Sequence, residues 1–194
     1  MIKAILYKEW IKLRWAVIVI AGLTILSLAY SIGMINYYIE FQGAFQNWLY
    51  VIGKSLLLKN IVFVKFLPLI TGLTFALLQF VPEMSRNRMR LSYHLPLSEK
   101  KLLLSSVGIG YMFLLAEILF LFFGLWLVVG INYPAEVVQK ALLSTLPWFL
   151  GGSAVYFLPS FIILEPSWTY RIIYGVVSYG IVTMYYEAST YDHY

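Results

Sequence analysis

The chain has 194 residues, of which 61% are hydrophobic and only 12% are charged, and its formal net charge is +5. Soluble domains carry roughly a quarter charged residues, so this composition excludes an ordinary water-soluble fold and indicates a membrane protein. We expect no nucleic-acid binding, because the basic residues do not form one face interleaved with base-stacking aromatics. The absence of cysteine excludes disulfides, iron–sulfur clusters and thiolate zinc sites.

The first segment, 1–14, predicts an amphipathic helix that lies on the cytosolic membrane surface. Its apolar residues fall on roughly one face, and Lys8 and Arg14 lie beside that face. Glu9 points toward the apolar face, where a carboxylate needs a partner such as a basic residue from another segment. The alternative is a frayed N-terminal turn with Glu9 in water.

Apolar runs of a length suited to crossing a bilayer occupy most of the remaining chain. We therefore expect an all-α fold, a single polytopic transmembrane domain over 1–194 with about five to six spans. The expected spans are 15–38, 61–81, 102–130, 135–164 and 171–186. The span at 135–164 is expected to be bent or broken, because Pro147 and Pro159 remove helix hydrogen bonds and the Gly151–Gly152 pair loosens the backbone.

Small and ionisable residues mark positions inside these spans. Ser106 and Gly110 are four positions apart, as are Ser27 and Ser31 in the first span, and this spacing favours close helix contact. Glu117 lies near the centre of the third span, where a charge costs at least a few kcal/mol. It is expected either to face a subunit interface or substrate path, or to be a protonated acid hydrogen-bonded to Ser, Thr or backbone of a neighbouring helix.

Lys65 lies in the second span, about one helical turn from its outer end. Its side chain is expected to extend to the membrane interface rather than to act as a buried functional charge.

One long polar segment, 82–105, interrupts the apolar runs and carries a cluster of basic residues. Basic residues concentrate here and at the N-terminus, so the positive-inside rule places both in the cytosol. The charges of this segment either bind a partner or only set the orientation of the chain in the membrane.

Motifs that suggest phosphate or metal binding are incomplete. The Gly-Lys-Ser sequence at 53–55 lacks the earlier Gly of a phosphate-binding loop, because Trp48 stands there. His94 and His193 lie on opposite expected sides of the membrane and cannot share a metal. No Ser/His/Asp set or carboxylate pair can be assembled on one face, so we expect no enzyme, no metal site and no cofactor in this chain.

Three short motifs stand at the cytosolic ends of the expected spans. They are Lys8-Glu9-Trp10 with Lys12 and Arg14, then Glu83 followed by a basic stretch, and finally Leu95-Pro96-Leu97-Ser98 followed by Lys100 and Lys101. With this arrangement the chain resembles the ABC-2 type transporter permeases, which are the membrane subunits of ATP-binding-cassette exporters. That family usually has six spans, whereas five are evident here.

The resemblance implies that 1–14 is an elbow helix with Lys8, Glu9, Trp10 and Arg14, and that the cytosolic loop 82–101 holds a coupling helix over about 84–93. The residues implied to couple to the ATPase are Glu83, Met84, Arg86, Arg88, Arg90, Leu91, Tyr93 and Leu95. The implied partners are a cytosolic ABC ATPase that holds ATP and Mg, a second permease copy or a paralogue in a dimer, and membrane lipids. The implied location is the bacterial cytoplasmic (inner) membrane.

The resemblance implies a permease subunit that moves substrate across the membrane by conformational changes driven by a separate ATPase. Two other functions compete with it. One is a non-transporting membrane anchor or sensor whose basic loop recruits a protein or anionic lipid headgroups. The other is an intramembrane enzyme acting on lipid, which needs at least two convergent catalytic groups, and Glu117 alone does not provide them.

Overall fold

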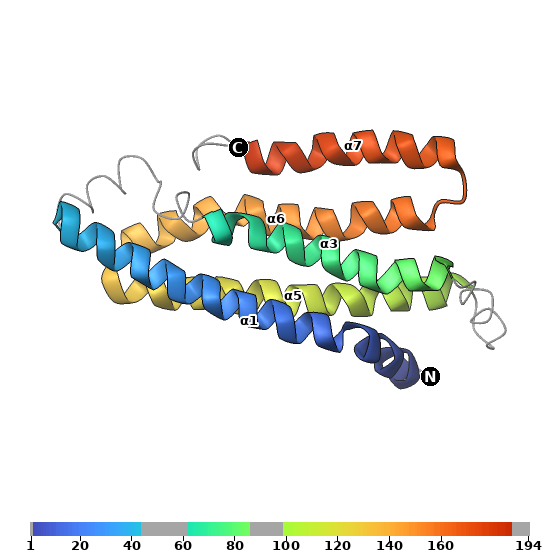
Figure 1. Ribbon diagram of the computed structural model, residues 1–194, viewed down its shortest axis with the longest axis horizontal. Helices are drawn as coiled ribbons and strands as arrows, with labels where there is room; N and C mark the ends of the chain where they lie inside the picture. Colours follow the sequence, from blue (N-terminus) through green and yellow to red (C-terminus); the bar gives the residue numbers. More distant parts are fainter. Residues whose placement is uncertain (1, 44–61, 86–98, 188–194) are drawn as a thin grey trace.

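The computed structural model describes residues 2–43, 62–85 and 99–187. Within these ranges the chain forms helices and no strand, which confirms the all-α expectation. The helices are α1 (Ile2–Gln42), α3 (Val62–Ser85), α5 (Glu99–Asn132), α6 (Ala135–Leu164) and α7 (Trp168–Glu187). Figure 1 shows them side by side in an elongated bundle, with each helix running opposite to the one before it.

Four of these helices are long and apolar enough to cross a membrane, by length and composition. The segments are Lys3–Phe41, Val62–Met84, Lys101–Asn132 and Ala135–Leu164. Large apolar side chains such as Leu26 and Met112 are exposed on their outer faces, as expected for contact with hydrocarbon. The multi-pass membrane character is therefore supported by four helices. α7 has 20 residues but is not among them, so a fifth or sixth span stays a prediction.

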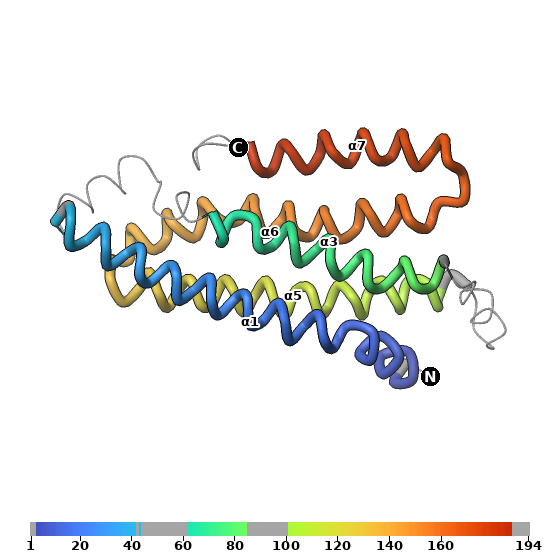
Figure 2. The backbone as a smooth tube through the Cα atoms, viewed as in Figure 1, coloured from blue at the N-terminus to red at the C-terminus, as the bar shows by residue number. Residues whose placement is uncertain are grey.

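The segment 1–14 is not a separate helix. Residues 2–14 form the first part of α1, which continues without interruption from Ile2 to Gln42 and contains no proline. Figure 2 shows that the first turns of α1 turn away from the axis that the rest of the helix follows. The expected boundary between segment 1–14 and the first span is thus not a break in the helix.

The fourth span is expected to be bent or broken, and the structure shows that it is not broken. α6 is one helix from Ala135 to Leu164, with Pro147 and Pro159 inside it. A helix tolerates an internal proline when neighbouring side chains and helices compensate for the lost backbone hydrogen bond.

The glycines of α6 serve a close helix crossing rather than loosening the backbone. A Cβ atom on Gly152 would lie 2.7 Å from Pro68 Cβ and 2.8 Å from the Pro68 carbonyl oxygen. A Cβ atom on Gly72 would collide with the Gly152 carbonyl oxygen. The backbones of α3 and α6 therefore touch, and small residues are required where they do so.

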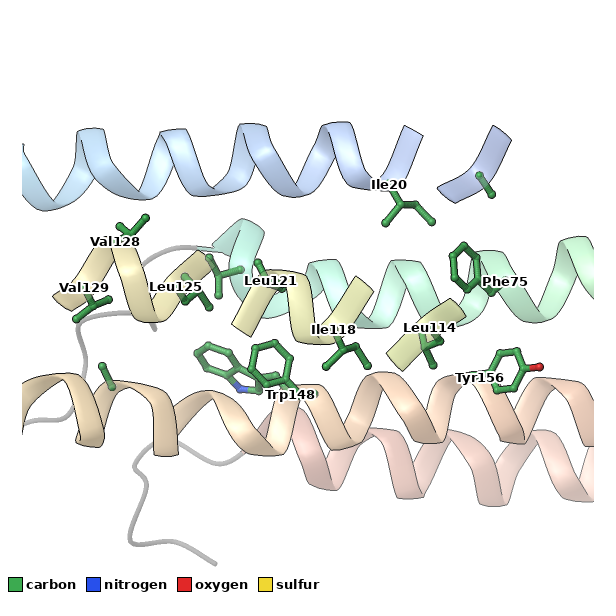
Figure 3. Close-up of a cluster of buried hydrophobic side chains, with 14 of the residues drawn as sticks. Ile20, Phe75, Leu114, Ile118, Leu121, Leu125, Val128, Val129, Trp148 and Tyr156 are labelled. Carbon is green, nitrogen blue, oxygen red and sulfur yellow. The ribbon is translucent and has the colours of Figure 1, made fainter. Parts of the chain in front are cut away.

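The core lies between α1, α3, α5 and α6. Figure 3 shows Ile20 from α1, Phe75 from α3, Leu121 from α5 and Trp148 from α6 converging on this region. Tyr156, also from α6, is fully buried and brings a hydroxyl group into the same layer. α7 lies outside this core, because it packs against α6 and its only buried residue is Ser178.

Candidate functional site

Four ionisable side chains meet where α1 begins and α3 ends. Lys12 Nζ lies 2.6 Å from Glu83 Oε1 and 3.1 Å from Glu9 Oε1. Lys8 Nζ lies 2.7 Å from the same Glu83 oxygen. Glu9 is fully buried and Glu83 is 3% exposed, whereas Lys8 is 42% exposed. Two ammonium groups therefore face two carboxylates, as buried charges require.

Helix geometry places these groups together. Lys8 and Lys12 are one turn apart on the same face of α1, so both reach one acceptor on a neighbouring helix. Glu83 lies in the last turn of α3, where the negative end of the helix dipole disfavours a carboxylate. The two lysines offset that repulsion, and this ion-pair cluster joins the beginning of α1 to the end of α3.

Hydrogen bonds extend the cluster into α5 and α6. Ser106 Oγ donates to Glu9 Oε1 at 3.1 Å, and Gln79 Nε2 donates to the Ser106 carbonyl oxygen at 2.7 Å. The Tyr156 hydroxyl donates to Gln79 Oε1 at 2.7 Å, and the Val107 carbonyl oxygen is also within reach at 2.9 Å. One polar network, from Lys8 to Tyr156, thus connects four helices.

Gly110 makes room for this network. A Cβ atom there would collide with Gln79 Oε1 and with the Tyr156 hydroxyl oxygen. Ser106 and Gly110, predicted as a close-contact pair, are both buried, which confirms the pair as a contact face. Their small size leaves space for polar side chains from α3 and α6, a role that the spacing alone does not indicate.

The prediction for Glu9 is partly confirmed. Its basic partner is Lys12 of the same helix, while another helix supplies the Ser106 hydroxyl. The alternative, with Glu9 in water, is wrong because the side chain is fully buried. Its second oxygen, Oε2, is buried without a hydrogen-bond partner among the described residues.

The other two residues of the implied elbow do not join the cluster. Trp10 packs its ring against Phe113 of α5, with 5.6 Å between ring centres. Arg14 is exposed, and its guanidinium group lies 5.7 Å from the ring centre of Trp15. Only Lys8 and Glu9 of the four elbow residues therefore belong to the polar network.

Two of the implied ATPase-coupling residues, Glu83 and Met84, are described, and both belong to the last turn of α3. α3 continues to Ser85, so a coupling helix does not begin at Met84. The rest of the predicted coupling helix is outside the described residues, and so are Arg86, Arg88, Arg90, Leu91, Tyr93 and Leu95.

Glu117 is buried inside the single chain, with 8% of its side chain exposed. Its Oε2 atom has no hydrogen-bond partner within the described ranges, so the predicted bond from a neighbouring Ser, Thr or backbone group is not found for this oxygen. Glu117 and Glu9 thus share a feature, which is a buried carboxyl oxygen without a partner.

Lys65 makes a tertiary contact in addition to lying near a helix end. Its Nζ donates to the Tyr186 carbonyl oxygen at 2.8 Å, close to the C-terminus of α7, where a cation complements the helix dipole. The Phe66 ring stacks on that of Tyr186, and the Tyr186 hydroxyl donates to the Trp148 carbonyl at 3.2 Å. These contacts hold the end of α7 against α3 and α6.

Sequence reasoning missed Gln79 and Tyr156 as members of the network. Gln79 lies one turn before Glu83 on the same face of α3, and this spacing of two polar residues at the end of an apolar helix is a usable signal. Tyr156 has no such signal, because tyrosine is common throughout this chain.

Within the described ranges, no group of three or more His, Cys, Asp or Glu side chains could hold a metal ion. No protein-family model matches the chain, and neither a curated protein nor a solved structure matches it. Any functional assignment therefore depends on the polar network and on the sequence motifs.

Proposed function

We propose that the chain is the membrane subunit of an exporter of the ABC-2 type, driven by a separate cytosolic ATPase. The observation that supports this proposal is the contact of Glu83 with Lys8 and Lys12. The lysines belong to the proposed elbow, and Glu83 directly precedes the segment proposed to dock on the ATPase. The two motifs that resemble the family thus meet in space, although 71 positions separate Lys12 from Glu83.

The proposed mechanism uses the ion-pair cluster as a mechanical connection. A force on segment 86–98 acts first on the end of α3, which carries Glu83. Moving the end of α3 away from the beginning of α1 would take Glu83 away from both Lys8 and Lys12 and leave a buried carboxylate unpaired, at a cost of about 3–5 kcal/mol. The beginning of α1 is therefore expected to move together with the end of α3.

The rest of the network transmits this displacement further. Ser106 connects Glu9 to Gln79, and Gln79 connects to Tyr156 in α6. A shift of α3 thus acts on α5 and α6 through directional hydrogen bonds. We propose that the helices alternate between two packings, and that ATP binding in the partner changes their populations.

The proposed assembly places ATP and Mg in the partner, since the sequence lacks a complete phosphate-binding loop. Two permease chains, identical or paralogous, form the transport unit in the bacterial cytoplasmic membrane, with the N-terminus in the cytosol. Substrate crosses along the helices rather than through a water-exposed domain.

The test is affinity purification of the tagged full-length chain in mild detergent, followed by identification and ATPase assay of the proteins that accompany it. An ATPase should co-purify, and reversing the charges of Arg86, Arg88 and Arg90 to Glu should release it. The matched control reverses Lys54 and Lys59, which are expected on the opposite side of the membrane and should have no effect.

A preparation without any ATPase, unaltered by the arginine reversals, would contradict the proposal. A partner without ATPase activity that is lost on the same reversals would instead support a membrane anchor or sensor.

A further inference from the structure

A groove opens at the end of the bundle where α3 ends, α6 ends and α7 begins, on the right in Figure 1. Its volume is about 420 Å³, and its lining residues are Val81, Met84, Ile162, Ile163 and Arg171. Four of these side chains are apolar and come from α3 and α6. Arg171, from the first turns of α7, is the single charged residue of the lining.

The Arg171 side chain is held in position by two contacts. Its Nε donates a hydrogen bond to the Glu165 carbonyl oxygen at 2.6 Å, and its guanidinium group lies 5.3 Å from the ring centre of Trp168. No carboxylate in the described part of the chain lies within ion-pair distance of it. The two terminal NH₂ groups therefore remain as donors for an anion, and their planar arrangement suits the oxygens of a phosphate.

We propose that this groove binds an anionic phospholipid, with its phosphate on Arg171 and an acyl chain along Val81 and Ile162. The chemistry of the lining selects this occupant. One cation stands at the ends of membrane-spanning helices, where lipid headgroups lie, and the remaining lining is apolar. Basic pockets between helices at this depth bind anionic headgroups. The proposal requires that the chain span a membrane and is independent of the proposed ATPase partner.

The bound lipid would touch the last turn of α3 beside the ion-pair cluster. Val81 and Met84 line the groove, and they flank Glu83, whose carboxylate pairs with Lys8 and Lys12. Lipid binding is therefore expected to stabilise the end of α3 in the packing described above. Anionic lipid should accordingly raise the midpoint of thermal unfolding in detergent, by mass action on the folded state.

The test is native mass spectrometry of the full-length protein in mild detergent, titrated with phosphatidylglycerol or with phosphatidylcholine of the same acyl chains. The wild type should retain one phosphatidylglycerol in preference to phosphatidylcholine. Arg171→Gln should reduce that preference about fivefold, which corresponds to about 1 kcal/mol per basic residue near an anionic headgroup. Glycerol 1-phosphate, which carries the phosphate without an acyl chain, should not displace the lipid.

Arg14→Gln is the matched control. Arg14 also lies beside an adjacent tryptophan ring, but it is not among the residues that line this groove. Its removal should leave the phosphatidylglycerol preference intact. Equal losses of the phosphatidylglycerol preference in the two arginine variants would show general charge attraction and would contradict a specific lipid site in the groove. So would an unchanged preference in Arg171→Gln.

A second variant tests the groove without altering its charge. Ile162→Trp retains Arg171 and fills the apolar part of the groove, so it should weaken retention of phosphatidylglycerol. Undiminished retention in a monodisperse preparation of this variant would overturn the proposal even if Arg171→Gln could not be purified.

Discussion

Lys12 Nζ lies 2.6 Å from Glu83 Oε1, and the two side chains are 15% and 3% exposed. The pair joins the beginning of α1 to the end of α3, so one charge interaction connects these two helices. Because neither group is well solvated, each depends on its ion-pair partners in the cluster for its stability. This dependence makes the pair a structural connection between the two helix ends, and in the proposed mechanism a displacement of one end moves the other.

The two lysines of the ion-pair cluster should differ in importance. Lys12→Met leaves buried Glu9 without its cation and is expected to lower stability by about 3 kcal/mol. Lys8→Met removes a lysine that is 42% exposed, and Glu83 keeps Lys12, so the loss should stay below about 1 kcal/mol. Thermal unfolding in mild detergent measures both, and similar losses for the two variants would contradict the assigned burial.

Gly110→Ala should damage the polar network without removing any of its members. The added methyl group would collide with Gln79 Oε1 and the Tyr156 hydroxyl, so the hydrogen bond between them must break or α5 must move. We expect a loss of about 1–3 kcal/mol from overpacking, together with reduced stimulation of the proposed ATPase partner. Gly108→Ala is the control two positions away, where a Cβ meets nothing within 4 Å. Equal behaviour of the two variants would argue against the network.

Gly152→Ala should separate α3 from α6 at their crossing. Its Cβ would meet Pro68 at 2.7 Å, and backbone atoms at this site cannot move aside cheaply. The expected loss of stability is about 1–3 kcal/mol. Gly33→Ala, in open space on α1, should be neutral or stabilising by up to about 1 kcal/mol, because alanine favours helix. The unfolding midpoints of the purified variants measure both effects. An unchanged midpoint in Gly152→Ala would contradict the close crossing of α3 and α6.

Glu117→Gln tests whether the buried carboxyl has a role in transport. The substitution preserves size but removes the ionisable group, so assembly and yield should remain normal while, under the proposed transport function, the ATPase activity of the complex with the proposed partner falls. Glu117→Asp retains a carboxyl and should keep part of the activity. Activity equal to wild type in Glu117→Gln would remove this residue from the mechanism.

The orientation of the chain can be measured directly because it contains no cysteine. Single cysteines at Phe41, Pro166 and Glu187, all exposed, report the ends of α1, α6 and α7. With the N-terminus in the cytosol and α7 crossing the membrane, a membrane-impermeant maleimide added outside intact cells should label positions 41 and 187 but not 166. Labelling of position 166 from outside would show that the chain has the opposite orientation in the membrane. Protection of 187 would show that α7 does not cross.

Local patterns in the sequence predict much of the fold. Long apolar runs predict membrane helices because each residue contributes independently to the free energy of transfer into hydrocarbon. The same local reasoning is wrong at the start of α1, where a separate surface helix over 1–14 is predicted, and it does not foresee that α6 continues as one helix through Pro147. Helix continuity depends on packing as well as on composition.

The sequence by itself determined the membrane class, the helical content and the exclusion of cysteine chemistry, and it marked Glu9, Glu83 and Glu117 as unusual. Only the tertiary structure decided that Glu83 pairs with lysines of α1, and that Gln79 and Tyr156 complete the network in the space left by Gly110. The physical reason is that partners on different helices depend on the rotation and depth of each helix against its neighbours. Those quantities are set by the packing of the whole core and by no local spacing of residues.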